Sequence, residues 1–215
     1  MLRKEKFLHG IIFHVYNKSI AGYKIFYYSD NITRFLQILH YYNVSQVNKR
    51  FSYFIRTKSL NKLNLLYPKK DSIIKFLSYC IMPDHYHFLI KIQKNDCFSQ
   101  YINNVENSYS RFFNIKCNRK GPLWQSTFKA VEVKTQEQLL HTTRYIHLNP
   151  TTSKLVINPK DWKCSSYKDY INDKNILSKI ITEIAIKNPN FYKKFVLDRK
   201  DYQQKLKKIK KLLLE

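Results

Sequence analysis

Two apolar runs separated by a short turn, between Ser72 and Ile92, constrain the fold of this chain more than any other feature. The first run reads IIKFLSYCI and the second HYHFLIKI, and both are rich in the β-branched and aromatic residues that favour strands. Met82, Pro83 and Asp84 lie between them, and Pro with Asp supplies the chemistry of a tight turn. The segment therefore predicts two successive strands joined by a turn.

Strand and helix patterns alternate on both sides of this hairpin. Residues 10–18, GIIFHVYNK, predict a first strand, and residues 128–133 predict a last one. After the first strand, Ser29 or Asp30 can cap a helix with regularly spaced apolar residues. A second helix is predicted over residues 98–114 from its single apolar stripe. The residues of that stripe are Phe98, Ile102, Val105, Tyr109 and Phe112.

A third helix is predicted after the last strand. Thr135 and Gln138 have the spacing of a capping box, which marks a helix start. The helix continues through QLLHTTRYIHL and is expected to end near Asn149, because Pro150 disfavours helical geometry in the residue before it. The predicted order is therefore strand, helix, strand, strand, helix, strand and a further helix.

This order matches the split βαβ arrangement, so we predict an α+β, ferredoxin-like fold. Its antiparallel sheet carries two helices on one face and leaves the other face available for a site. We assign residues 1–155 to this domain and residues 156–215 to a basic, mainly helical C-terminal extension.

Three segments carry weaker patterns. Residues 51–57, FSYFIRT, can form a strand, and residues 177–187 can form a helix that Asn188 and Pro189 would stop. Residues 193–215 combine an apolar stripe with nine basic and three acidic residues, a net charge of +6. That tail either packs on the core with a solvated outer face or contacts DNA phosphates.

The chain is strongly basic, with 39 Lys and Arg residues against 15 Asp and Glu residues, a formal net charge of +24. Such a field attracts polyanions and predicts a nucleic-acid partner, although the composition of an AT-rich genome would raise the charge as well. No run approaches the roughly 18 apolar residues of a membrane span, and no signal-peptide pattern is present. The four cysteines form neither a zinc motif nor a disulfide framework. We therefore expect a cytoplasmic protein without membrane contact.

His85 and His87 begin the second strand of the hairpin, separated by one residue. Alternate strand residues point to the same face, so the two imidazoles project together while Tyr86 faces the other way. Such a pair can bind one divalent metal ion, although neighbouring histidines are more often solvent-facing or packed. The spacing alone leaves both interpretations open.

Tyr145 and Asn149 lie four residues apart near the end of the third helix, so the phenol and the amide share one helix face. A tyrosine hydroxyl can attack a phosphodiester when a metal ion polarises the phosphate oxygens. His85, His87 and Asn149 make a reasonable ligand set for Mg²⁺ or Mn²⁺, and histidine tilts the affinity toward Mn²⁺. A tyrosine at the edge of an amphipathic helix is the alternative. Tyr109 is a competing nucleophile, but its apolar stripe places it in the core.

Four segments in order resemble the single-tyrosine HUH transposases: YCIMPDHYHFLIKI, SYSRFFN, GPLWQSTFKA and RYIHLNP. More narrowly, they are similar to the REP-associated tyrosine transposase branch of the insertion-sequence-200-like superfamily, over about residues 8–170. The resemblance implies that His85, His87 and Asn149 hold the catalytic metal and that Tyr145 is the nucleophile. It also implies the same ferredoxin-like sheet.

The resemblance implies cleavage of single-stranded DNA through a 5′-phosphotyrosine intermediate, followed by rejoining to another 3′-OH. The expected substrate is a single strand that carries a small imperfect hairpin. The expected DNA contacts are basic residues in or beside the motifs: Arg111, Arg119, Lys120, Lys129 and Arg144. A domesticated or inactive hairpin-binding protein is the alternative, and the sequence leaves monomer or homodimer open.

Three positions need separate comment. Asp84 stands where many relatives carry Asn, so its carboxylate either raises the metal affinity or caps the turn. Ser126 and Thr127 replace the more usual Gly-Arg, which removes one expected cationic phosphate contact. His14, on the first strand, either faces the metal site or stacks in the sheet, and we do not count it as a ligand.

Overall fold

The structure of the protein is a computed structural model that describes residues 6–47, 51 and 64–200. Most of the FSYFIRT segment, and the tail beyond residue 200 with most of its apolar stripe, lie outside the described residues. Within the described part of the chain, no helix combines the length and the apolarity that a membrane span requires.

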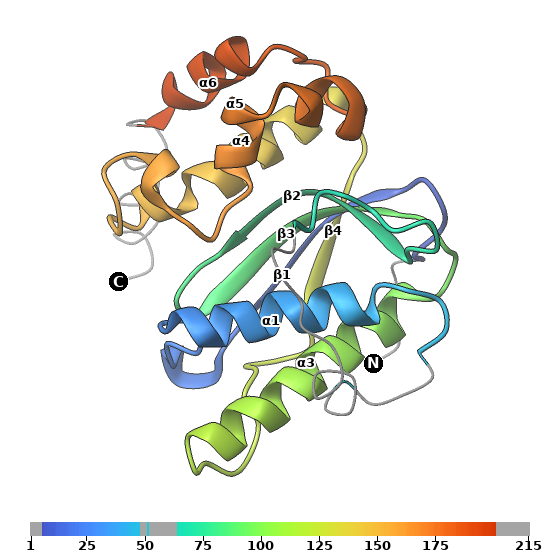
Figure 1. Ribbon diagram of the computed structural model, residues 1–215, viewed down its shortest axis with the longest axis vertical. Helices are drawn as coiled ribbons and strands as arrows, with labels where there is room; N and C mark the ends of the chain where they lie inside the picture. Colours follow the sequence, from blue (N-terminus) through green and yellow to red (C-terminus); the bar gives the residue numbers. More distant parts are fainter. Residues whose placement is uncertain (1–5, 48–50, 52–63, 201–215) are drawn as a thin grey trace.

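Four antiparallel strands form the sheet, in the order β2-β3-β1-β4. They are β1 (Ile12–Lys18), β2 (Ile74–Ile81), β3 (His85–Ile92) and β4 (Lys129–Val133). Helix α1 (Ser29–Tyr42) connects β1 to β2, and helix α3 (Phe98–Lys116) connects β3 to β4 (Figure 1). This is the split βαβ topology, so the predicted ferredoxin-like fold is confirmed.

The other helices of the described chain follow the sheet, and three short helical turns complete the secondary structure. The helices are α4 (Gln136–Thr152), α5 (Tyr167–Asn172) and α6 (Pro189–Leu197). The turns are two 3₁₀ turns, Ile20–Gly22 near the N-terminus and Pro159–Asp161, and one π-helical turn, Ile176–Ile180.

Helices α1 and α3 cover one face of the sheet, as predicted (Figure 1). Tyr86 and Phe88 of β3 point into this layer and stack with their ring centroids 4.3 Å apart. Phe35 of α1 lies 5.6 Å from the Tyr86 ring and 5.0 Å from the Tyr109 ring of α3. These rings are almost completely buried, so they form the main core of the domain.

Helix α4 lies over β2 and β3 on the opposite face, and α6 packs against α4 and α5 (Figure 1). We expected this face to stay open, and that expectation was wrong for its β2-β3 side. The physical reason is that α4 has its own apolar stripe, whose members Leu139, Thr143 and Ile146 are buried. A candidate site on this face must therefore lie between α4 and the sheet.

The start of α4 confirms the predicted capping box. The Thr135 hydroxyl accepts the backbone N–H of Gln138 at 3.1 Å. The Gln138 side chain reaches back to the backbone N–H of Lys134 at 2.8 Å, one residue before the cap itself. Two N–H groups at the helix start are thus satisfied.

The end of α4 differs from the prediction, because the helix passes through Pro150 and ends at Thr152. Lys154 adopts a left-handed conformation with φ of 57°, and its N–H bonds the Thr151 carbonyl at 3.0 Å. The Leu155 N–H bonds the Pro150 carbonyl at 2.9 Å, which completes a Schellman motif. Burial of the last turn and this C-terminal cap offset the local preference against helix before proline.

Asn188 and Pro189 begin a helix, whereas we expected them to stop one. The Asn188 side chain accepts the backbone N–H groups of Asn190 at 2.8 Å and Phe191 at 3.3 Å, and Pro189 takes the first turn of α6. Asn at the N-cap followed by Pro is a helix-start signature. The predicted helix over residues 177–187 is reduced to the π-helical turn and a following irregular segment.

The C-terminal segment is anchored to the edge of the sheet at β2. The Ile81 N–H donates to the Cys164 carbonyl at 2.8 Å, and the Ser166 N–H donates to the Tyr79 carbonyl at 3.0 Å. The buried imidazole of His147 on α4 contacts the Ser166 hydroxyl at 2.8 Å through Nε2. This pairing covers an edge that would otherwise expose backbone groups.

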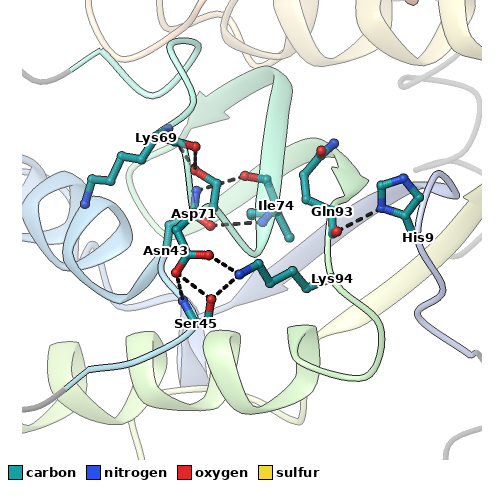
Figure 2. A network of polar contacts seen from close by, with 9 residues as sticks. His9, Asn43, Ser45, Lys69, Asp71, Ile74, Gln93 and Lys94 are labelled. Atoms are coloured by element: carbon teal, nitrogen blue, oxygen red, sulfur yellow. Dashed lines mark hydrogen bonds and ion pairs between the residues drawn. The ribbon is translucent and has the colours of Figure 1, made fainter.

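A polar network joins the segment after α1 to β2 and to the end of β3 (Figure 2). The Asn43 amide donates to the Ile74 carbonyl at 2.9 Å and accepts the Ile74 N–H at 3.0 Å. Lys94 contacts both the Asp71 carboxylate and the Ser45 hydroxyl. These contacts join segments that lie far apart in sequence.

Candidate active site

The strand β3 presents His85 and His87 on the same face, as the alternation predicted. Their ring centroids lie 5.1 Å apart and the ring planes are nearly perpendicular. His87 is buried between neighbouring strands, opposite Tyr16 of β1 and Cys80 of β2, whereas His85 at the strand start is partly exposed. Both rings face away from the aromatic core.

His14 of β1 faces the same site, which the sequence left undecided. Its Nε2 lies 3.0 Å from Nδ1 of His87, and the two rings are stacked with centroids 5.2 Å apart. Burial lowers the pKa of His14 to about 4. Burial, and then the nearby His14 and His85, lower the pKa of His87 well below its ordinary value. His14 and His87 are therefore neutral at pH 7, the form in which imidazole binds metal ions.

Asp84 contacts Nδ1 of His85, as His14 contacts Nδ1 of His87. Its Oδ1 lies 2.5 Å from Nδ1 of His85, and its Oδ2 lies 3.4 Å from the Lys18 ammonium. Partial burial would raise the pKa of Asp84, but the contacts with His85 and Lys18 outweigh it and leave the pKa lowered. The carboxylate thus orients the His85 ring. A role limited to capping the turn does not account for this contact.

Tyr145 of α4 lies over the histidines. Its ring centroid is 5.6 Å from that of His87 and 6.0 Å from that of His14. Tyr145 is 40% exposed, so solvent reaches part of its side chain. Burial raises the pKa of the phenol, which is therefore protonated near neutral pH.

Asn149 lies one helical turn after Tyr145, and only 6% of its surface is exposed. The Asn149 side chain lowers the pKa of the Tyr145 phenol and so partly offsets the effect of burial. The Asn149 Nδ2 atom is buried and has no hydrogen-bond partner among the described residues. A buried amide nitrogen without an acceptor is costly unless a ligand, such as a phosphate oxygen, accepts its hydrogen. The two side chains thus share one helix face, as the spacing predicted.

A divalent metal site was predicted from His85, His87 and Asn149. Within the described residues, no group of three or more His, Cys, Asp or Glu side chains is arranged to hold a metal ion. A site here would therefore need a neutral oxygen ligand beside the imidazoles. The side-chain oxygen of Asn149, one helical turn after Tyr145, is of the chemical type required, because amide oxygen is an acceptable ligand for Mg²⁺ or Mn²⁺.

Tyr109, the competing nucleophile, lies in the core on the opposite side of the sheet. It is fully buried, its hydroxyl donates to the Ile25 carbonyl at 2.6 Å, and burial raises its pKa. These contacts leave Tyr109 no route to a substrate.

The predicted DNA contacts occupy different environments. Arg111, Lys120 and Lys129 are exposed. Arg119 is partly buried, and its guanidinium donates to the Asn114 side chain and the Pro122 carbonyl, both at 2.6 Å. These positions remain predictions, and the first three have the accessibility that a phosphate contact needs.

Arg144 is 9% exposed and lies between α4 and α6. Its guanidinium lies over the Phe195 ring at 4.3 Å, donates to the Phe195 carbonyl at 3.3 Å and contacts His141 at 2.9 Å. The geometry gives this side chain a packing role between the two helices.

Comparison with known proteins places these motifs in a family. Residues 36–149 match the family described as "Transposase IS200 like". A Haemophilus influenzae protein named "Putative REP-associated tyrosine transposase" is 24% identical over 141 residues, which cover 60% of this chain and 79% of the relative. Among solved structures, a REP-associated tyrosine transposase bound to a REP hairpin is similar, with a TM-score of 0.52 and 16% identity over 80% of this chain and 86% of that one.

The family match spans more than half of the chain and includes β2, β3, α3, β4 and most of α4. The structural similarity independently shows the same fold, since it persists at low sequence identity. The chain therefore belongs to the IS200-like transposase family, as its motifs predicted, and it is similar to the REP-associated tyrosine transposases.

Proposed function

We propose that this protein cleaves and rejoins single-stranded DNA at hairpin-bearing ends, with Tyr145 as the nucleophile. The observation that carries the proposal is the position of the Tyr145 ring, 5.6 Å from His87 and 6.0 Å from His14. Tyr16 of β1 also lies near His87, with ring centroids 5.7 Å apart, but it projects from a central strand and is less exposed than Tyr145.

The reaction follows from the chemistry of a phenol beside a phosphodiester. The Tyr145 phenol releases its proton to solvent and its oxygen forms a bond to phosphorus, while the bond from phosphorus to the 3′ oxygen breaks and the 3′ oxygen takes up a proton. The products are a 5′-phosphotyrosine and a free 3′-OH. Attack by another 3′-OH reverses the step and rejoins strands, because the number of phosphodiester-type bonds is unchanged.

His85, His87 and Asn149 would hold a divalent cation, Mg²⁺ or Mn²⁺. When bound, the ion would polarise phosphate oxygens and stabilise the charge that develops on phosphorus. Asp84 and His14 engage the Nδ1 atoms of His85 and His87, so Nε2 of each ring is the nitrogen that we propose for a ligand. Such contacts hold the two rings in place in the manner of outer-shell partners at metal sites, and ligation through Nε2 would require that each Nδ1 carry the proton.

The hairpin substrate is proposed from similarity and charge. The solved relative is bound to a REP hairpin, and the net charge of +24 favours a nucleic-acid partner. Exposed Arg111, Lys120 and Lys129 are proposed phosphate contacts.

A covalent-adduct gel with labelled hairpin DNA tests the proposal. The wild type should form a band resistant to denaturant in Mg²⁺ or Mn²⁺ and none in EDTA. Tyr145→Phe should abolish the adduct while it leaves hairpin binding nearly unchanged, because only the nucleophilic oxygen is removed. Tyr67→Phe, which removes a partly exposed phenol bonded to Asp173, is the matched control and should retain the adduct.

An adduct that persists in Tyr145→Phe would contradict the nucleophile assignment. Hairpin binding without any adduct from the wild type would favour a DNA-binding protein that has lost turnover.

A further inference from the structure

The loop between β1 and α1 exposes three aromatic side chains outside the candidate active site. Tyr23, Tyr27 and Tyr28 are 51%, 64% and 63% exposed. Tyr27 and Tyr28 are perpendicular, with ring centroids 5.2 Å apart, so they present a ring face and a ring edge side by side. We refer to these three residues as the tyrosine patch.

The loop backbone is held in place, so the exposure does not come from a loosely attached segment. Ile25 and Phe26, between the tyrosines, are almost completely buried. The Ile25 carbonyl accepts bonds from the Asn31 amide at 3.0 Å and the Tyr109 hydroxyl at 2.6 Å. Apolar residues of this loop are thus already packed, and the tyrosines contribute little to the core.

Three cations lie against the rings of the tyrosine patch, and one of them, Lys116, is also paired with the carboxylate of Asp30. The Lys24 ammonium lies 5.8 Å from the Tyr27 ring centroid, and the Lys116 ammonium lies 5.8 Å from that of Tyr28. The Arg119 guanidinium lies 5.2 Å from the Tyr23 centroid. Lys116 and Arg119 come from the C-terminal end of α3 and the loop after it, so two segments build one surface (Figure 1).

This surface lies next to the turn that carries the candidate metal ligands. The Phe26 N–H donates to the Pro83 carbonyl at 2.9 Å, and the Ser19 N–H donates to the Asp84 carbonyl at 2.8 Å. Asp84 in turn contacts His85. A strand that enters the site past His85 would therefore pass close to the tyrosine patch.

We propose that the tyrosine patch is a stacking platform for unpaired bases of single-stranded DNA next to the cleavage site. Exposed aromatic rings can stack on the π-faces of unpaired bases, and the cations beside them can attract the phosphates of the same strand. Stacking is tolerant of sequence, so the patch would hold the strand without reading it. The inference rests on the proposed function for its substrate class.

Equilibrium binding of a labelled oligothymidine strand, in EDTA so that no cleavage occurs, tests the platform. Tyr27→Ala with Tyr28→Ala should weaken binding at least about fivefold, the low end for one stacked base. The same double variant should bind an abasic strand of equal length as the wild type does, because that strand keeps the phosphates but cannot stack. Tyr27→Phe with Tyr28→Phe should retain full affinity.

Phe191→Ala is the matched control, since it removes a 70% exposed ring from α6. It should leave both affinities unchanged. Equal losses on the oligothymidine and abasic strands, or no loss on either, would overturn the proposal.

Photo-crosslinking of a strand containing 5-bromouracil provides a readout independent of the variants. The crosslinked peptide should contain Tyr23, Tyr27 or Tyr28, and crosslinks confined to other peptides would contradict the platform. The result is separable from the cleavage chemistry. A platform that binds bases in a protein that forms no adduct would refute the proposed reaction alone.

Discussion

Nε2 of His14 on β1 lies 3.0 Å from Nδ1 of His87 on β3, across adjacent antiparallel strands. His14 therefore supports the imidazole that is most deeply buried in the site, as Asp84 does for His85. Both contacts engage the Nδ1 atom of the ring. The site thus includes partners for its histidines as well as the histidines themselves.

We predict that His14→Ala lowers Mn²⁺ affinity about 10- to 100-fold, the usual effect of losing an outer-shell partner. Electron paramagnetic resonance of free Mn²⁺ measures this directly without DNA. Hairpin binding in EDTA should remain unchanged. His9→Ala is the control, because exposed His9 bonds the Gln93 carbonyl at 2.8 Å, away from the site. Equal Mn²⁺ affinity in both variants would show that His14 does not support the site.

Cleavage should accelerate with rising pH, because burial raises the pKa of the Tyr145 phenol and the attacking oxygen must lose its proton. The rate should increase about tenfold per pH unit until the pKa of the bound state is reached. Single-turnover cleavage at saturating Mg²⁺ measures the profile. Asn149→Ala should move it to higher pH, since the amide lowers the phenol pKa. A flat profile in the wild type would refute a rate limited by phenol deprotonation.

Stability should fall in acid because of His147. This imidazole is buried, contacts Tyr192 and Ser166, and has its pKa lowered from 6.5 to about 3 by burial. The unfolded chain therefore takes up a proton that the folded chain excludes. Above about pH 6.5, His147 is neutral in both states and the free energy of unfolding is not reduced by its titration. As the pH falls from 6.5 toward 3, the free energy of unfolding decreases by about 1.4 kcal/mol per pH unit.

Urea denaturation at a series of pH values measures this dependence. His147→Gln retains hydrogen-bonding capacity but does not titrate, so its free energy of unfolding should change less steeply with pH. The same slope in both proteins would assign the acid sensitivity to other buried groups.

Arg144→Ala should lower stability by about 1–3 kcal/mol, because the guanidinium packs on Phe195 and bonds its carbonyl. The dependence of hairpin affinity on salt should stay the same. Lys120→Ala should show the reverse, with stability within about 0.5 kcal/mol of wild type and a salt slope shallower by about 0.7 to 0.9. A shallower salt slope in Arg144→Ala would show that this residue contacts phosphate after all.

The sequence alone determined the strands and helices of the ferredoxin-like domain and their order. Partial alternation marked β1, two apolar runs around a Pro-Asp turn marked the β2-β3 hairpin, the apolar stripe marked α3, and Thr135 with Gln138 marked the start of α4. These signals are local, because strand alternation, helical spacing and capping depend on residues a few positions apart. Local rules failed where tertiary burial outweighed them, as at Pro150, where packing and a C-terminal cap carried the helix onward.

Only the tertiary structure decided which residues meet at the site. His14 and His87 are 73 positions apart, and strand pairing alone brings their nitrogens to 3.0 Å. Likewise, Arg144 and Tyr145 are neighbours in sequence, yet the first packs between helices and the second faces the histidines. The physical reason is that register and helix rotation are set by the whole core. A motif can specify which side chains are present, but it cannot specify which of them converge.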